Sequence, residues 1–324
     1  MLQVAFAGTF PASLEQPVRR HLTTRCEITV GTEADILPKL SSVDVLVTMG
    51  FTAEMGRAAT RLKLVQVPGA GIDRIDRSGL PDGALLANAY GHETGIAEYV
   101  IGAILAMTRE FLRLDGALRH GNWQSQWAVG VSPPPVWPEL AGRTIGILGY
   151  GRIGQHVARL ARAFDMQICA IRRNVEQSST DALALLGGPD LLDEILRRSD
   201  YLVISMPATP ETVGCIGRAQ LGRMKPSAFL INVARAEIID EEALYDALSQ
   251  RRIAGAALDV WYRYPREPGS AAPATRPFHE LPNVLMTPHV SGWTDGMLDA
   301  RARLIAENIR RVAHGETPLN LVSK

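Results

Sequence analysis

The feature that most constrains the fold is a glycine-rich segment, Gly149–Gly154 (GYGRIG), placed directly after the apolar run Thr144–Leu148 (TIGIL). Four apolar residues follow it at the spacing of one helix face: Val157, Leu160, Ala161 and Phe164. In a strand–turn–helix of this kind, the first glycine permits the tight turn, the second lets backbone approach a pyrophosphate, and the third allows helix and strand to pack closely. We therefore predict a dinucleotide site. Its residues would be Gly149, Gly151, Arg152, Ile153 and Gly154.

The chain then alternates short apolar runs with helical patterns. Such runs, without period-2 alternation, are typical of strands buried on both faces of a parallel sheet. After Thr144–Leu148 they are Gln167–Ile171, Tyr201–Ser205, Phe229–Asn232, Gly255–Asp259 and Val284–Met286. This order predicts a Rossmann-type doubly wound α/β domain, which we place at residues 97–287.

A second α/β pattern precedes it and predicts a smaller domain. Its apolar runs are Val4–Ala7, Val43–Val47, Leu64–Val67 and Leu85–Ala87. A long helix is expected from Ile96, with one face formed by Ile101, Ile104, Leu105, Thr108 and Leu112. A last amphipathic helix is expected at Met297–His314.

Composition excludes several classes of function. The 324 residues include 34 basic and 34 acidic side chains, so no nucleic-acid or anionic-membrane surface is expected. The first residues lack a basic stretch followed by a long apolar core, and no later window offers an uninterrupted apolar span, which favours a cytoplasmic protein with no membrane partner. Cys26, Cys169 and Cys215 lie far apart and indicate neither a disulfide framework nor a metal site.

The residue that reads the adenosine ribose follows the second strand, about 20 positions beyond the glycines. Here the strand ends in Arg172 and Arg173. Guanidinium groups cannot accept a hydrogen bond from a 2′-hydroxyl but clamp a 2′-phosphate well, so we predict NADP, with NAD as the second choice. The nearest carboxylate, Glu176, comes several residues late for the NAD role.

Three further side chains follow neighbouring predicted strands. Arg235 comes after Phe229–Asn232, Asp259 ends the next strand, and His289 follows Val284–Met286. Doubly wound sheets bind ligands at the carboxyl ends of their strands, so these residues are expected to share one site with the glycine loop.

Six ordered segments carry a resemblance to a known family. They are LKLVQVPGAGIDRID (62–76), PELAGRTIGILGYGRIGQHVAR (138–159), SMPATPET (205–212), MKPSAFLINVARAEIIDEEAL (224–244), IAGAALDV (253–260) and LPNVLMTPH (281–289). On these segments the chain resembles the D-2-hydroxyacid dehydrogenases, which include glyoxylate and hydroxypyruvate reductases. The resemblance implies a flavodoxin-like substrate domain at residues 1–96 and 288–324 around the dinucleotide domain, and a homodimer formed through the larger domain.

The resemblance also implies roles for individual residues. Arg235 would hold the carboxylate of a small 2-keto or 2-hydroxy acid and polarise its keto oxygen, and His289 would be the catalytic acid and base beside the cofactor. Backbone groups of Ala70 and Gly71 would hold the other end of the substrate carboxylate. Asp259 would contact the nicotinamide carboxamide. The remaining residues expected to line the cofactor are Pro207, Thr212 and Ala234.

One departure from the family concerns the partner of the histidine. Most members have a glutamate five residues after the aspartate of the fifth strand, whereas this chain has Tyr264. A phenol can orient an imidazole but stabilises the imidazolium little, so we expect a less basic His289. Alternatively, Glu267 supplies the partner from a shifted loop. The roles of His92 and Glu93, in a loop shorter than usual, are left open.

The interpretation that follows is an NADP(H)-linked 2-keto acid reductase of the glyoxylate or hydroxypyruvate class. An NAD-linked D-2-hydroxyacid or D-3-phosphoglycerate dehydrogenase is the alternative within enzymes, against which the double arginine argues. A dinucleotide-sensing binding protein without turnover is the alternative of another class, against which the presence of both Arg235 and His289 argues. The substrate side chain and the physiological direction are left open.

Overall fold

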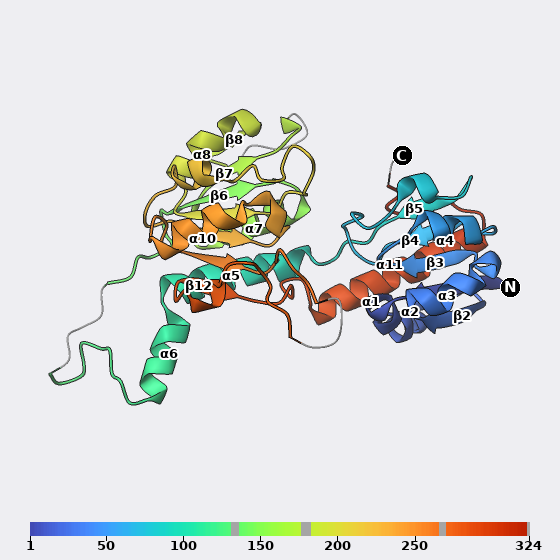
Figure 1. Cartoon of the computed structure of the whole chain (residues 1–324), viewed down its shortest axis with the longest axis horizontal. Helices are drawn as coiled ribbons and strands as arrows, with labels where there is room; N and C mark the ends of the chain where they lie inside the picture. The colour runs from blue at the N-terminus through green and yellow to red at the C-terminus, as the bar shows by residue number, and fades with distance from the viewer. Residues whose placement is uncertain (131–135, 176–182, 266–269, 323–324) are drawn as a thin grey trace. The chain divides into compact units, whose positions relative to one another are not determined.

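The computed structural model describes residues 1–130, 136–175, 183–265 and 270–322. It divides into two compact units, one of residues 1–92 with 293–324 and the other of residues 93–292. Each unit is an α/β layered structure around a parallel sheet, as the sequence predicted (Figure 1). No helix in these ranges is long and apolar enough to cross a membrane.

The sheet of the first unit has, within the described residues, the strand order β2-β1-β3-β4-β5, which is the flavodoxin-like order. Its strands are β1 (Leu2–Ala7), β2 (Cys26–Gly31), β3 (Val45–Thr48), β4 (Leu64–Gln66) and β5 (Leu85–Ala87). Its helices are α1 (Thr9–Ser13), α2 (Glu15–His21), α3 (Glu33–Ile36), α4 (Ala53–Ala58) and α11 (Asp295–Ala313).

Helices cover both faces of this sheet. Leu14 and Val18 near α2 pack with Ile305 and Ile309 of α11 against one face. Ile36, Leu40 and Met55 pack against the other face. The last helix of the chain therefore completes the core of the first unit, which explains why its apolar stripe is needed.

The sheet of the second unit runs β12-β11-β10-β9-β6-β7-β8 across the described residues. The strands are β6 (Thr144–Leu148), β7 (Gln167–Ile171), β8 (Leu185–Gly187), β9 (Tyr201–Ile204), β10 (Phe229–Asn232), β11 (Gly255–Leu258) and β12 (Val284–Met286). The helices are α5 (Glu93–Thr108), α6 (Phe111–Arg119), α7 (Arg152–Ala163), α8 (Leu192–Arg198), α9 (Arg218–Leu221) and α10 (Glu241–Ser249). The order reverses between β6 and β9, as in a Rossmann-type sheet, and this reversal is where such sheets bind dinucleotides.

Helices α5 and α7 pack on one face of this sheet, and α8 and α10 on the other. Val157 and Ala161 of α7 are fully buried with Ile101 and Ile104 of α5. These positions of the predicted apolar stripes are confirmed. Phe164, predicted on the stripe of α7, instead follows the end of the helix and is 37% exposed.

The long helix predicted from Ile96 to Leu112 is interrupted. Helix α5 ends at Thr108, Glu110 has a left-handed backbone with φ of 51°, and α6 starts as a separate helix. The side chain of Leu112, expected on the buried face of that helix, is 67% exposed. A non-glycine residue in this conformation ends the helical hydrogen bonding, so the periodic pattern does not continue as one helix.

Candidate active site

The three glycines after β6 have three different surroundings. Gly149 has φ of 105°, and a Cβ there would lie 2.5 Å from the backbone nitrogen of Met206. A Cβ on Gly154 would lie 2.4 Å from the carbonyl oxygen of Gly149, so helix α7 can approach β6 only without a side chain. A Cβ on Gly151 would meet nothing within 4 Å. The first and third glycines therefore serve the fold, while the second leaves open space at the amino end of α7, as a pyrophosphate requires.

The glycine loop is held at the point where the strand order reverses. The hydroxyl of Ser205, after β9, donates to the carbonyl of Gly149 at 2.9 Å. The backbone N–H groups of Gly149 and Tyr150 both donate to the carbonyl of Ile171, at 3.1 and 2.8 Å. These bonds join the ends of β6, β7 and β9, so the loop is fixed before any ligand binds.

Side chains predicted to contact the cofactor lie along this edge. Arg152 begins α7 with an exposed side chain, its Nη1 atom 3.9 Å from the Oε1 atom of Glu93, and Ile153 follows it, half-buried. Arg172 is half-buried and Arg173 exposed at the end of β7, where the N–H of Arg172 donates to Gly187 at 2.9 Å. The two arginines directly follow Ile171, whose carbonyl is hydrogen-bonded to the glycine loop. They therefore occupy the position after the second strand where a ribose-reading residue is expected.

The loop after β9 carries Pro207 and Thr212. The hydroxyl of Thr212 donates to the carbonyl of Pro207 at 2.7 Å and accepts from the N–H of Thr209 at 2.7 Å. Thr212 thus closes the loop on itself, and its role toward a cofactor stays a prediction.

Arg235 follows β10 on a tied backbone. The side-chain amide of Asn232 donates to the carbonyl of Arg235 at 2.9 Å, while its oxygen accepts from the N–H of Ala234 at 3.1 Å. The Nη1 atom of Arg235 donates to the carbonyl of Ala234 at 2.8 Å. Asn232 is 1% exposed, so the two hydrogen bonds of a buried side-chain amide hold this turn in place.

Asp259 holds the segment that carries His289. Its Oδ1 atom accepts from the hydroxyl of Thr287 at 2.6 Å and from the N–H of Val290 at 2.8 Å, and its Oδ2 atom accepts from the N–H of Ser291 at 2.9 Å. His289 itself has φ of 60°, a conformation that non-glycine residues seldom adopt. The buried carboxylate therefore fixes an otherwise unfavourable turn, and the predicted contact of Asp259 with a nicotinamide stays a prediction.

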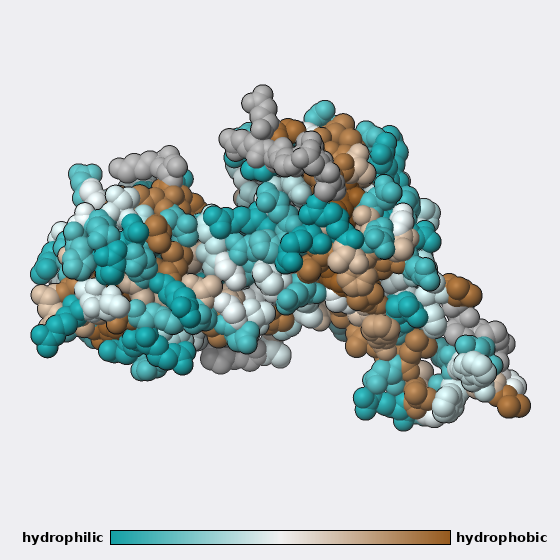
Figure 2. All heavy atoms as spheres, turned by 180° about the vertical axis from the view of Figure 1, so that it is seen from behind, coloured by the Kyte–Doolittle hydropathy of each residue, from teal (hydrophilic) through white to brown (hydrophobic). Residues whose placement is uncertain are grey.

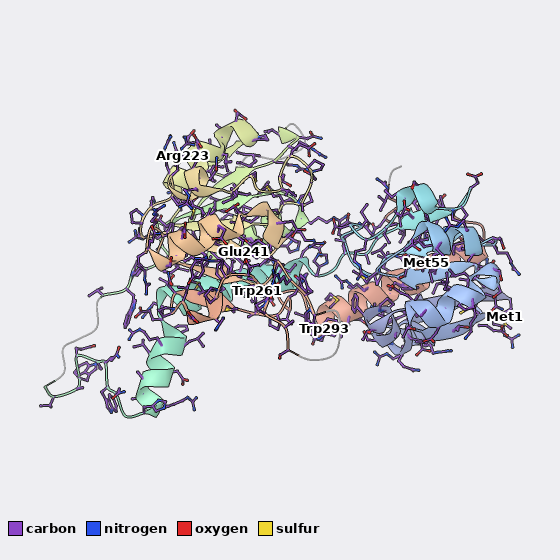
Figure 3. The ribbon with its side chains drawn as sticks, viewed as in Figure 1. Met1, Met55, Arg223, Glu241, Trp261 and Trp293 are labelled. Carbon is purple, nitrogen blue, oxygen red and sulfur yellow. The ribbon has the colours of Figure 1, made fainter. Side chains whose placement is uncertain are left out.

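Aromatic residues complete the support of this segment. The indole nitrogen of Trp261, labelled in Figure 3, donates to the carbonyl of Thr287 at 2.8 Å. The hydroxyl of Tyr99, from α5, lies 2.7 Å from the hydroxyl of Thr287. Sequence reasoning missed Thr287 and Tyr99 as positioning residues, because nothing in the spacing of these positions relates α5 to β12.

The imidazole of His289 contacts Tyr264. The phenol oxygen lies 2.8 Å from Nδ1 of His289, and it accepts from the backbone N–H of Trp261 at 3.3 Å. The structure thus brings Tyr264 to the histidine, as one of the two alternatives from the sequence required. The other, Glu267, lies outside the described residues, as does Glu176.

The charge on His289 is disfavoured. Partial desolvation lowers the pKa of its imidazole below the ordinary value, the Asp259 carboxylate opposes this, and the nearby Arg235 guanidinium lowers the pKa further. Burial raises the pKa of the Tyr264 phenol, which keeps this partner neutral. The lower basicity expected for His289 from the missing glutamate agrees in direction with these surroundings.

Ala70 and Gly71 lie in the first unit, beyond the carboxyl end of β4. The carbonyl of Ala70 accepts from the side-chain amide of Asn88 at 2.9 Å, and the carbonyl of Gly69 accepts from the N–H of Ala89 at 3.0 Å. The loop is therefore fixed to the segment after β5. Its predicted role toward a substrate carboxylate stays a prediction.

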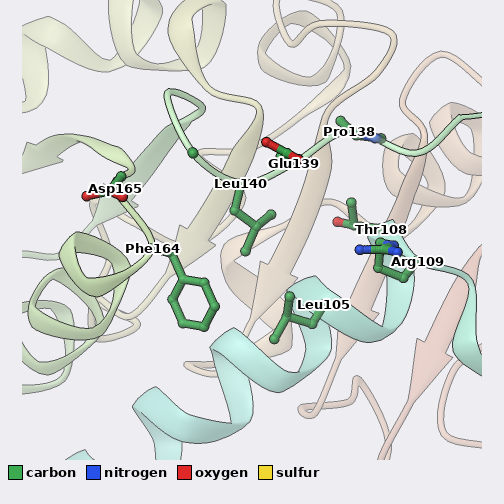
Figure 4. A pocket seen from close by; sticks show the side chains of 9 residues that line it. Leu105, Thr108, Arg109, Pro138, Glu139, Leu140, Phe164 and Asp165 are labelled. Carbon is green, nitrogen blue, oxygen red and sulfur yellow. The ribbon is translucent and has the colours of Figure 1, made fainter.

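A cavity of about 230 Å³ lies elsewhere in the second unit (Figure 4). Its lining includes Thr108 and Arg109 at the end of α5, Leu140 before β6, and Phe164 and Asp165 before β7. It therefore lies toward the amino ends of β6 and β7, away from the strand ends that carry the glycine loop and Arg235. We assign it no part in the candidate active site.

The chain is similar to known proteins over most of its length. Residues 101–291 match the family model described as D-isomer specific 2-hydroxyacid dehydrogenase, NAD binding domain. A glyoxylate reductase of Pyrococcus furiosus is 35% identical over 305 residues, covering 89% of this chain and 85% of that protein. A D-3-phosphoglycerate dehydrogenase of Methanocaldococcus jannaschii is 33% identical over 306 residues, covering 92% of this chain but 55% of that protein, so the chain spans about half its length.

Solved structures with the same fold include two that hold a reduced nicotinamide cofactor. An acyclic imino acid reductase, Bsp5, in complex with NADPH and D-Arg, is 26% identical with a TM-score of 0.81, and the match covers 100% of both chains. A D-isomer specific 2-hydroxyacid dehydrogenase from Xanthobacter autotrophicus Py2, in complex with NADPH and MES, is 26% identical with a TM-score of 0.80, covering 99% of this chain and 98% of that one.

Proposed function

The chain belongs to the D-isomer specific 2-hydroxyacid dehydrogenase family, and we propose that it works as an NADPH-linked reductase of small 2-keto acids of the glyoxylate or hydroxypyruvate class. The observation that carries the proposal is the arrangement around His289. Its imidazole is hydrogen-bonded to Tyr264 and lies within the electrostatic reach of Arg235, at the strand ends that also carry the glycine loop.

In this proposal Arg235 binds the carboxylate of the substrate and draws electron density from the adjoining keto oxygen. Bound NADPH supplies the hydride that reduces C2. His289 donates the proton that the C2 oxygen takes up, and Tyr264 holds Nδ1 so that Nε2 is the nitrogen that reaches the substrate. Asp259 keeps the histidine segment in place throughout.

The preference for NADPH rests on Arg172 and Arg173. Two guanidinium groups at the end of β7 suit a 2′-phosphate, and no carboxylate occupies either of these two positions. The NADPH held by two similar structures supports the same choice. The open space at Gly151 would accommodate the pyrophosphate of NADPH and of NADH equally, so it does not distinguish the two cofactors.

The test measures oxidation of NADPH and of NADH at the nicotinamide absorbance, with glyoxylate, hydroxypyruvate, pyruvate and phenylpyruvate. We expect turnover with NADPH preferred, and a rise of about tenfold or more in KM for NADPH in Arg172→Gln, since a charge-assisted hydrogen bond is lost. Arg159→Gln, exposed on α7, is the control and leaves KM unchanged. A preference for NADH would contradict the cofactor proposal alone, and tight cofactor binding without turnover would favour a sensor.

A second candidate substrate is a 2-imino acid. The protonated imine carries its own proton, so its reduction needs no acid from the protein, and a neutral histidine beside a neutral phenol avoids repelling it. The lowered pKa of His289 and the phenol partner favour this candidate, and the similar Bsp5 structure is that of an imino acid reductase. NADPH oxidation that requires both pyruvate and an amine would support it, whereas full rates with the keto acid alone would contradict it.

A further inference from the structure

A chain of hydrogen bonds runs from helix α5 to the segment that carries His289. The hydroxyl of Tyr99 lies 2.7 Å from the hydroxyl of Thr287, and Thr287 donates to Oδ1 of Asp259 at 2.6 Å. Because the single proton of the Thr287 hydroxyl is directed to the carboxylate, its oxygen accepts from the phenol. The chain therefore has one direction, from Tyr99 through Thr287 to Asp259.

The surroundings keep this chain intact. Asp259 is 0% exposed and Tyr99 is half-buried. Burial raises the pKa of the Tyr99 phenol to about 12, the hydrogen bond with Thr287 opposes the shift, and the negative charge of Asp259 adds to it. The phenol therefore keeps its proton at neutral pH and remains a donor. In a place shielded from water, hydrogen bonds linked in this way strengthen one another.

The chain ends on the turn that presents the imidazole. His289 has φ of 60°, which is unfavourable for a residue with a side chain, and Asp259 holds the turn from both sides. On one side the carboxylate accepts from the Thr287 hydroxyl, and on the other from the N–H groups of Val290 and Ser291, at 2.8 and 2.9 Å. If the bond on the Thr287 side weakens, the turn can relax and the imidazole changes direction.

Packing does not require the hydroxyl of Tyr99. Its ring belongs to the apolar layer between α5 and the sheet, and the residues one helical turn away, Ile96 and Ala103, are apolar and buried. A phenylalanine would fill the same space. Thr287 is the hydrogen-bond partner of the hydroxyl among the residues that the structure describes. The ring therefore serves the core, and the hydroxyl serves the chain to Asp259.

We propose that Tyr99 is a positioning residue for the reaction, whose hydroxyl fixes, through Thr287, the direction in which the imidazole of His289 points. This inference rests on the proposed function, in which the imidazole gives a proton to the substrate. Tyr264 contacts the imidazole itself, at Nδ1, whereas Tyr99 acts on the backbone that carries it. Helix α5 thereby becomes part of the support of the active site.

The experiment compares two Tyr→Phe variants in hydroxyl pairs of α5. Tyr99→Phe removes the donor to Thr287, and Tyr201→Phe, the matched control, removes the hydroxyl that lies 2.9 Å from that of Thr108 at the other end of α5. Tyr201 begins β9, so it lies at the amino end of the sheet, away from the strand ends that carry His289. With the keto acid that the unmodified protein reduces fastest, we expect kcat to fall about fivefold in Tyr99→Phe, as for the loss of one hydrogen bond, and to stay nearly unchanged in Tyr201→Phe.

A double variant tests the route through Thr287. Thr287→Val removes both hydroxyl bonds, so Tyr99→Phe in that background should lower kcat no further. Independent losses that multiply would overturn the route. Both Tyr→Phe variants each lose one buried hydroxyl pair and should lose similar stability, so kcat of the folded proteins, and not the melting temperature, separates positioning from a structural role.

A kcat in folded Tyr99→Phe equal to that of the unmodified protein, or an equal loss in Tyr201→Phe, would overturn the proposal. If Tyr99→Phe does not fold, Thr287→Ser, which keeps both hydroxyl bonds, is compared with Thr287→Val. A loss of kcat in Thr287→Val alone then supports the proposal, and equal kcat overturns it.

If the unmodified protein reduces none of the keto acids, the proposed function fails, and magnetic resonance of the His289 imidazole nitrogens decides on the positioning role. The resonances are assigned with His289→Gln. A change in Tyr99→Phe that is absent in Tyr201→Phe supports the role, and resonances unchanged in both variants overturn it.

Discussion

The phenol of Tyr264 stands where most of the family has a glutamate, and this exchange predicts an altered pH dependence. In the proposed mechanism reduction requires protonated His289, whose pKa lies below the ordinary value of about 6.5. The protonated form is complete below this lowered pKa and is lost as pH rises through it, so kcat/KM for reduction should fall at lower pH than in relatives with the glutamate. Tyr264→Glu places a negative charge near the imidazole, and it should move the falling limb to higher pH.

Tyr264→Phe separates the orienting role from the charge. It keeps the ring but removes the hydroxyl that lies 2.8 Å from Nδ1 of His289, so we expect kcat to fall about tenfold with little change in melting temperature. Profiles of kcat/KM against pH for the three proteins provide the measurement. If all three profiles coincide, Tyr264 neither orients His289 nor sets its basicity.

At the scale of elements, two glycines in the turn from β6 into α7 have different roles: Gly154 is required for folding and Gly151 for binding. Gly154→Ala would place a methyl group 2.4 Å from the carbonyl of Gly149, and overpacking of this kind costs about 1–3 kcal/mol in stability. Gly151→Ala meets nothing within 4 Å, so it should fold normally while its methyl group obstructs the pyrophosphate. Thermal unfolding and NADPH binding measured on both variants provide the check. Equal losses of stability, or unchanged NADPH affinity in Gly151→Ala, would contradict this division.

How far the elements could be predicted depends on burial. The central strands of the second unit were predicted within a residue because strands covered on both faces leave continuous apolar runs. Strand β2 (CEITVG) was missed, since it is an edge strand whose side chains are partly exposed and partly polar. Strand β8 (LLG) was missed because it is a short edge strand that is only partly buried and ends in a glycine. The break at Glu110 was missed because the apolar spacing runs on past it.

The candidate site was predictable where the chemistry depends on a strand end. Arg235 and His289 follow strands directly, so their common edge could be inferred from the order of strands. The contacts that position them could not, since Tyr99 reaches Thr287 across 188 positions of sequence and Asp259 binds Ser291 across 32. Likewise, nothing in the sequence pairs His92 with Arg301, which are 209 positions apart.

At the scale of the whole molecule, helix α6 buries none of its own residues against the part of the chain that the structure describes. None of its residues is buried in the structure, although Phe111, Leu112 and Leu118 are apolar and more than half exposed. The residues that follow include Trp123 and Trp127, exposed by 58% and 84%. Apolar side chains are visible at the surface of this segment, at the lower right of Figure 2. Exposed apolar residues grouped in this way are typical of an interface between subunits.

We therefore predict a homodimer that buries α6. The family resemblance implied a homodimer through the larger domain, to which α6 belongs. Leu112→Glu with Leu118→Glu introduces two charges into this interface without altering a buried position, so the dimer should dissociate into folded monomers. Sedimentation velocity gives the mass, and circular dichroism confirms that the variant is folded. Val30→Glu, 45% exposed on edge strand β2, is the control that should remain dimeric. A dimer that survives both charges would place the interface elsewhere, and a monomeric unmodified protein would leave the exposure of α6 to be explained by another partner.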